Sequence, residues 1–119
     1  MLLKDIVDAV NADVLAGEEI LPLREITTVS ACDLMSDVLA FAKPGILLVT
    51  GLANSQVVRT AAIAQLSGVI IVRGKRPDND TIELARKMKV PLLSTSKHVF
   101  ELCVELFKIG LVGTDSDRS

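Results

Sequence analysis

The chain has no tryptophan and no tyrosine, and three phenylalanines are the only aromatic residues among its 119. A core without aromatic rings must consist of valine, isoleucine, leucine and alanine. Aliphatic cores of this kind are typical of parallel strands that helices cover on both faces. The scarcity of rings also removes the platforms on which single-stranded nucleic acid stacks. The composition therefore favours an α/β domain and excludes that class of nucleic-acid binder.

An excess of positive charge is also absent, since 13 basic residues face 15 acidic ones and the net charge is -2. No basic field is available to hold nucleic acid. No apolar run reaches the roughly 18 residues that a membrane span needs. The first ten residues include acids and no long apolar stretch, so they do not resemble a signal peptide. We therefore expect a cytoplasmic protein with neither a nucleic-acid nor a membrane partner.

Histidine and cysteine are too few for several kinds of chemistry. One histidine and two cysteines, Cys32 and Cys103, make neither a disulfide framework nor a metal cluster. His98 and Cys103 are five residues apart on one predicted helix and point to different faces, so they should not meet. We expect reduced thiols, no metal, no cofactor and no catalytic residues, although an isolated carboxylate such as Asp33 stays open as a catalytic group.

Aliphatic residues, in contrast, are abundant, and hydrophobic residues make up 50% of the chain. We expect one α/β domain over residues 1–112 and a frayed polar tail over 113–119. This hydrophobic fraction is high for a small monomer. We therefore expect two subunits to bury some of their apolar surface against each other. We therefore expect a homodimer.

Three short apolar runs predict buried strands. "GILLVTG" (45–51) and "GVIIVRG" (68–74) share the order glycine, four apolar residues, one polar residue, glycine, and "VPLLST" (90–95) follows. Less regular strands are predicted in "ADVLAG" and "EITTVSACD", with "EEILP" as the turn between them. Helical stretches separate the strands, which predicts a parallel or mixed sheet between two helix layers.

The helices carry start and stop signals. Asn54 or Ser55 is predicted to cap the helix after Gly51, and Asp80 with Glu83 has the spacing of a capping box. Another helix is predicted to start near Ser36. Asp33 and Asp37 are predicted to cap it, and the alternative is that one of these two acids pairs with Arg59. An apolar stripe at i, i+3, i+4 and i+7 predicts the core-facing side of the last helix: Val99, Leu102, Cys103 and Leu106.

The carboxyl ends of the three apolar strands should meet at one edge, where open α/β sheets bind their ligands. We predict the following ligand-binding residues there: Thr50, Gly51, Asn54, Gln56, Arg73, Gly74, Lys75 and Thr95. The basic residues have two interpretations, solvated loop charges or an anion site built with helix N-termini. A nucleoside-triphosphate loop is excluded, because Gly68 and Gly74 are spaced one residue too far apart and Arg76 stands where a hydroxyl is needed.

With these residues laid out, the chain resembles a stand-alone DRTGG domain and is similar to the N-terminal domain of HPr kinase/phosphorylase. The stretch "VIIVRGKRPDNDTIELARKMKVPLLSTSKHVFE" carries much of the resemblance. The motif itself is changed: Gly-Asp-Arg is Gly51-Leu52-Ala53 here, and Thr-Gly-Gly is Arg73-Gly74-Lys75. The residues that could replace the lost groups are Asn54, Gln56 and Arg73.

The resemblance implies a three-layer α/β fold and a regulatory or assembly role without kinase activity. Our leading hypothesis is a non-catalytic module that binds an adenine nucleotide or phosphorylated metabolite at the Gly51, Gly74 and Thr95 edge. The alternative is a ligand-free dimerisation or scaffold protein. The chain also resembles a single-domain subgroup encoded near iron hydrogenase genes, which implies hydrogenase assembly or regulation as a context.

Overall fold

A computed structural model describes residues 1–113 of the chain. Strands and helices alternate along this range in the following order: α1 (Leu3–Val10), β1 (Asp13–Ala16), the 3-10 helix η1 (Glu18–Leu23), β2 (Thr28–Ala31), α2 (Met35–Phe41), β3 (Ile46–Thr50), α3 (Ser55–Ala64), β4 (Gly68–Ile71), α4 (Asn79–Met88), β5 (Leu92–Ser94), α5 (Val99–Lys108) and β6 (Val112–Gly113). Gly113, the first residue of the predicted tail, lies in β6. The rest of that tail lies outside the described residues.

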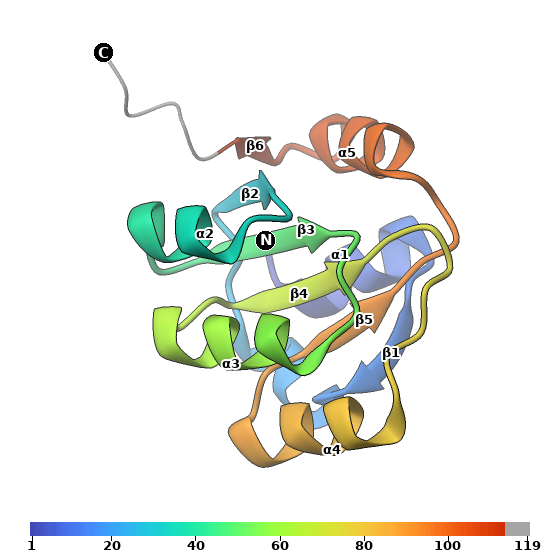
Figure 1. Cartoon of the computed structure of the whole chain (residues 1–119). Helices are drawn as coiled ribbons and strands as arrows, with labels where there is room; N and C mark the ends of the chain where they lie inside the picture. The colour runs from blue at the N-terminus through green and yellow to red at the C-terminus, as the bar shows by residue number, and fades with distance from the viewer. Residues whose placement is uncertain (114–119) are drawn as a thin grey trace.

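The strands form one mixed sheet in the order β1-β5-β4-β3-β2-β6 (Figure 1). β1 runs antiparallel to β5, and the other four neighbouring pairs are parallel. β3 and β4 lie in the centre, and every residue in both is buried. The predicted α/β class with a parallel or mixed sheet is therefore confirmed.

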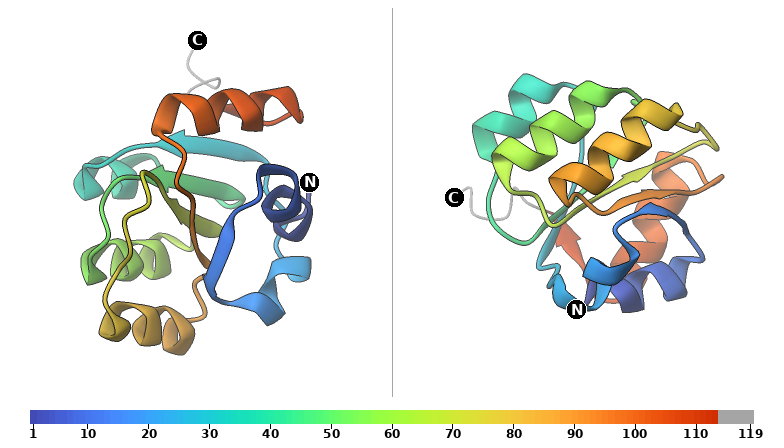
Figure 2. Two further views of the ribbon diagram at one scale, coloured as in Figure 1. Left: turned by 90° about the vertical axis from the view of Figure 1, so that its right-hand side faces the viewer. Right: turned by 90° about the horizontal axis from the view of Figure 1, so that it is seen from below.

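Helices cover both faces of the sheet and divide the core in two. One core contains side chains of α2, α3 and α4, and the other contains side chains of α1, α5 and η1. The two groups of helices stand on opposite sides of the sheet in Figure 2. Within residues 1–113, no helix combines the length and apolar character that crossing a bilayer requires.

Two of the predictions are wrong in detail, one about a turn and one about the start of a helix. The segment "EEILP" is a 3-10 helix rather than a simple turn, because its Ile20 and Leu21 pack into the core. Helix α4 begins earlier than the Asp80–Glu83 box predicts: Asp78 is its N-cap, and the carboxylate accepts a hydrogen bond from the Thr81 N–H at 2.9 Å. This hydrogen bond lowers the pKa of Asp78.

The cap of α3 is Asn54, one of the two predicted alternatives. Its Oδ1 accepts a hydrogen bond from the Val57 N–H at 3.3 Å. Replacing Asn54 with alanine should reduce the free energy of unfolding by about 1 kcal/mol, because an N–H of the first turn loses its partner. Urea denaturation measures this change. Ser55→Ala is the matched control, and an equal loss in that variant would contradict the assignment.

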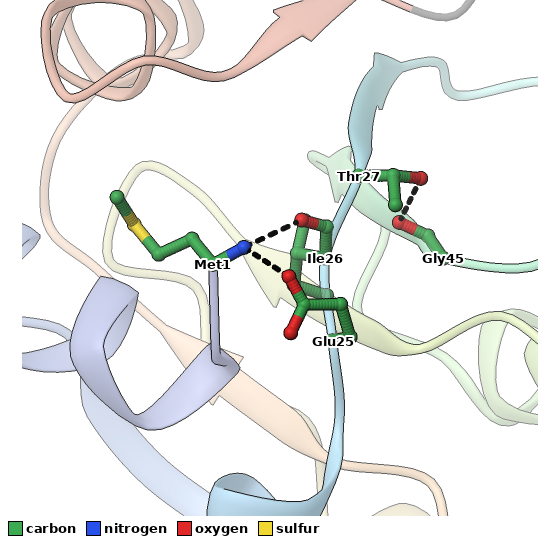
Figure 3. Close-up of polar contacts among 5 residues, drawn as sticks. All are labelled: Met1, Glu25, Ile26, Thr27 and Gly45. Carbon is green, nitrogen blue, oxygen red and sulfur yellow. Dashed lines mark hydrogen bonds and ion pairs between the residues drawn. The ribbon is translucent and has the colours of Figure 1, made fainter.

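Contacts at the amino edge of the sheet fasten the first residues beside β2 (Figure 3). The amino group of Met1 donates to the Ile26 carbonyl oxygen at 3.2 Å and pairs with Glu25. The hydroxyl of Thr27 donates to the carbonyl oxygen of Gly45 at 3.4 Å. These contacts lie at the opposite end of the strands from the predicted ligand site.

Candidate functional site

The loops after β3, β4 and β5 lie together at the carboxyl edge of the sheet. The loops after β4 and β5 are joined by their backbones: the Arg73 N–H donates to the Lys97 carbonyl at 2.8 Å, and the Gly74 N–H donates to the Thr95 carbonyl at 2.9 Å. Thr95 is buried, and its hydroxyl oxygen accepts a hydrogen bond from the Lys97 N–H at 3.2 Å. A displacement of one loop would therefore be transmitted to the other.

Arg73 reaches from the β4 loop to the β3 loop. Arg73 and Gly74 both have left-handed backbones, with φ of 66° and 69°, and this pair turns the chain sharply after β4. The Arg73 guanidinium lies against Gly51, with Nη2 only 2.7 Å from the point that a Cβ on Gly51 would occupy. A side chain at residue 51 would therefore force the Arg73 guanidinium to shift, whereas the φ of Gly51 is not in the left-handed region.

Asp33, at the end of β2, completes this edge. Its Oδ1 accepts hydrogen bonds from the Gly51 N–H and from the Thr50 hydroxyl, each at 2.8 Å. The Thr50 oxygen in turn accepts one from the Leu52 N–H at 3.2 Å. The Gly51 N–H is therefore already bonded to a carboxylate of the same chain and is not open to an anion.

Hydrogen bonding and nearby charge keep Asp33 ionised. The hydrogen bond from Gly51 is the largest cause that lowers its pKa, followed by that from Thr50, and the positive charges of Arg73 and Lys75 lower it further. A carboxylate with a lowered pKa is a poor general base at neutral pH. Burial raises the pKa of the Cys103 thiol, which disfavours the reactive thiolate. Neither the Asp33 carboxylate nor the Cys103 thiol, which lies apart on α5, is therefore poised as a base or a nucleophile.

Three basic or polar side chains, Asn54, Lys97 and Arg59, make other contacts or lie apart from Asp33. The side-chain carbonyl oxygen of Asn54 caps α3 by accepting a hydrogen bond from the Val57 N–H. The Lys97 amine donates to the Val10 carbonyl at 2.6 Å and lies 3.4 Å from Glu105. Within residues 1–113, no ion pair joins Arg59 to Asp33 or Asp37.

Gln56 is exposed on the first turn of α3. The residues that come together are therefore Thr50, Gly51, Arg73, Gly74 and Thr95, with Lys75 close enough to act electrostatically on Asp33.

Asp33 is absent from the predicted ligand-binding residues because the sequence favoured it as a helix cap. Helix α2 instead has Leu34 as its N-cap, without a side-chain hydrogen bond, so neither Asp33, Ser36 nor Asp37 caps it. An available signal was the position of Asp33 directly after a predicted strand, at the same edge as Gly51. The strand predicted in "EITTVSACD" exists but is shorter, Thr28–Ala31, and Asp33 follows its carboxyl end.

The hollow beside Asp33 is small, about 120 Å³, and Ala31, Cys32, Val49 and Val99 also line it. Two larger hollows lie elsewhere: one of about 410 Å³ between α5 and the β2–β6 edge, and one of about 370 Å³ near the ends of α3 and α4. Pockets for whole drug-sized ligands start near 300 Å³. The hollow beside Asp33 is therefore too small for a whole drug-sized ligand, and neither Arg73 nor Lys75 lines it.

Comparison with known proteins identifies a matching family and a solved structure with a similar fold. The model of the DRTGG domain family matches residues 5–108. No curated protein matches the chain. A solved structure of the CBS and DRTGG domains from the regulatory region of Clostridium perfringens pyrophosphatase, complexed with its activator diadenosine tetraphosphate, is similar in fold. The TM-score is 0.69 at 19% identity, and the match covers 88% of this chain but 45% of that one.

Proposed function

Because the chain belongs to the DRTGG domain family, we propose that it is a non-catalytic regulatory module that binds a small anionic ligand. The ligand is an adenine nucleotide or another phosphorylated metabolite, bound at the carboxyl edge of the sheet. The observation that carries this proposal is the Arg73 guanidinium resting on Gly51. A guanidinium in this position offers a planar fork to a phosphate, and Lys75 adds a second charge.

The arrangement suggests how binding could be sensed. A phosphate that recruits Arg73 away from Gly51 would compete with Asp33 for positive charge, since both cations act on that carboxylate. The backbone bond between Gly74 and Thr95 would carry the displacement to the loop after β5. Ligand binding would then favour one arrangement of the three loops over another. A regulatory switch works by such a shift between two conformations.

Adenine nucleotides are the first ligands to test. The carboxylate of Asp33 suits hydroxyl donors such as those of a ribose, and Arg73 suits the phosphate. The regulatory region from Clostridium perfringens, which shares this fold, is complexed with diadenosine tetraphosphate. Two free cysteines, Cys32 and Cys103, fit a reducing compartment, and we therefore place the protein in the cytoplasm.

Arg73→Ala should weaken binding of the phosphorylated ligand at least tenfold, because one charge-assisted hydrogen-bonding fork is lost. Thermal shift identifies the ligand among AMP, ATP, diadenosine tetraphosphate, sugar phosphates and inorganic phosphate at millimolar concentration. Calorimetric titration then compares the variants. Arg59→Ala, on the exposed side of α3, is the control that should leave affinity unchanged.

Two results would contradict the proposal. One is the absence of stabilisation by any of these compounds. The other is equal affinity in the wild type and in Arg73→Ala, which would put the ligand elsewhere on the molecule.

A second candidate function is that of a dimerisation or scaffold protein without a ligand, serving hydrogenase assembly or regulation. The observation that favours it is the position of the phenylalanines. Phe41, Phe100 and Phe107 are 39%, 81% and 71% exposed, so the core uses none of the three aromatic rings. Light scattering tests the association itself, and a strict monomer at high concentration would contradict this candidate.

A further inference from the structure

Helix α5 has two apolar stripes, of which the molecule uses one. Leu102 and Leu106 are buried in the core beneath the helix. Phe100, Cys103, Val104 and Phe107 follow the spacing i, i+3, i+4 and i+7 and lie on another side; we call these four residues the outer stripe. Both of its phenylalanines are more than two-thirds exposed. Figures 1 and 2 show α5 as an outer element at the β2–β6 end of the sheet.

The core-facing stripe predicted from the sequence was partly wrong. Val99 is 38% exposed, and Cys103 is only partly buried although it packs against the core; Leu102 and Leu106 are buried as predicted. The apolar character of α5 therefore exceeds what its own core requires. Contiguous apolar surface of this kind marks an interaction site.

Opposite charges flank the outer stripe on one side. Glu101 and Lys108 each follow one of the two phenylalanines and are exposed. Seven residues of an α-helix turn through nearly two full turns, so both charges lie along the same flank. The flank thus carries a negative charge near its start and a positive charge near its end.

We propose that the outer stripe of α5 is a homodimer interface, in which the helices of two copies pack antiparallel about a two-fold axis. An axis passing between Cys103 and Val104 brings Phe100 against the partner's Phe107, and the reverse contact follows by symmetry. The same operation places Glu101 and the partner's Lys108 on the same flank, offset by about 3 Å along the helix axis, twice per dimer. A parallel pairing would instead place the charged flanks of the two helices on opposite sides of the interface, where Glu101 and Lys108 would not meet.

Further apolar surface continues from the stripe toward the edge of the sheet. Phe107 also lines the hollow of about 410 Å³ between α5 and the β2–β6 edge, together with Leu111 and Val112. Val112 is 49% exposed. An interface centred on α5 can therefore extend over this groove. Other strongly exposed apolar side chains, such as Ile63 on α3 and Leu23 on η1, lie on separate elements.

The first experiment measures dimer dissociation by analytical ultracentrifugation across micromolar concentrations. Wild type should sediment as a dimer at tens of micromolar, and the double variant Phe100→Ser/Phe107→Ser should dissociate at least tenfold more readily. Circular dichroism checks that the variant is folded. Ile63→Ser is the matched control, because Ile63 is 72% exposed on another helix. A monomeric wild type, or a dimer that the double variant leaves intact, would overturn the proposal.

The second experiment tests the antiparallel register by charge reversal. Glu101→Lys and Lys108→Glu should each weaken the homodimer, because each sets two like-charged pairs at the interface. An equimolar mixture of these two variants should form a heterodimer, since both of its flanking pairs are again opposite in sign. If the mixture associates no better than the single variants, the register is wrong. The outcome is independent of ligand binding, because Arg73→Ala should retain the dimer mass.

Discussion

Replacing Gly17 by alanine is expected to lower the free energy of unfolding by roughly 3 kcal/mol. Two causes add in this variant. Gly17 has a φ of +89°, and a Cβ there would lie 2.9 Å from the Cα of Pro91. Because the atom it meets belongs to the backbone, a rotation of a side chain cannot relieve the contact. Urea denaturation should show a lower midpoint with an unchanged slope.

Gly110→Ala separates the two causes. Gly110 also has a left-handed backbone, with a φ of +107°, but nothing lies within 4 Å of its added Cβ. This control should therefore lose only about 1 kcal/mol, the cost of the backbone conformation alone. Equal losses in the two variants would mean that the chain near Gly17 yields easily and that Pro91 does not constrain it.

Gly17 matters because it ends the strand that the sequence could not place. Strands β3, β4 and β5 were predicted correctly, since glycine or proline bounds each short apolar run. The pairing of β1 depends on distant residues instead: Ala16 lies opposite Leu92, in an antiparallel pair with an irregularity after Val14. Local propensity describes a strand but not its neighbour, so the edge position of β1 and the placement of β2 beside β3 emerge only from the folded chain.

In the candidate site, too, the grouping of residues at one sheet edge was predictable from the sequence, but their individual contacts were not. Thr50, Gly51, Arg73 and Thr95 could be grouped from sequence because parallel strands share one carboxyl edge. The hydrogen bond between the Asp33 carboxylate and the Gly51 N–H could not be predicted, because it forms only when β2 pairs with β3, and the position of β2 in the sheet was unknown. The core-facing stripe predicted for α5 already left out Phe100 and Phe107, which are exposed, but its Val99 and Cys103 are not fully buried, because spacing alone does not show how wide the buried side of a helix is.

Asp33→Ala is the second variant expected to have a large effect, with a loss of about 2 kcal/mol in the free energy of unfolding. The carboxylate is the acceptor for two groups, the Gly51 N–H and the Thr50 hydroxyl. Both residues are buried, and Thr50 is fully so. Removing the acceptor leaves these donors without their partner, which costs more than the bond itself contributes. Chemical denaturation at neutral pH measures the loss.

Asp37→Ala is the matched control, because Asp37 is an exposed acid on the first turn of α2. It should change stability by less than about 0.5 kcal/mol. Asp33→Asn isolates charge from hydrogen bonding, since its amide oxygen can still accept. That variant should be more stable than Asp33→Ala, and it should bind phosphorylated ligands more tightly than wild type because a negative charge beside Arg73 is gone. An Asp33→Asn protein as unstable as Asp33→Ala would show that the charge, rather than the acceptor, stabilises the edge.

The dependence on pH follows from the direction of the pKa shift. The Gly51 N–H, then the Thr50 hydroxyl, and the charges of Arg73 and Lys75 lower the pKa of Asp33 below its ordinary value of 3.8. A depressed pKa means that the ionised group favours the folded state, so its contribution is fully present above the unfolded-state pKa. The contribution is lost as the pH falls through the lower folded-state pKa. The stability gap between wild type and Asp33→Asn should therefore stay constant from about pH 5 to 8 and narrow on acidification below that range. Denaturation curves at a series of pH values check this, and a gap that widens in acid would reverse the sign assigned to the interaction.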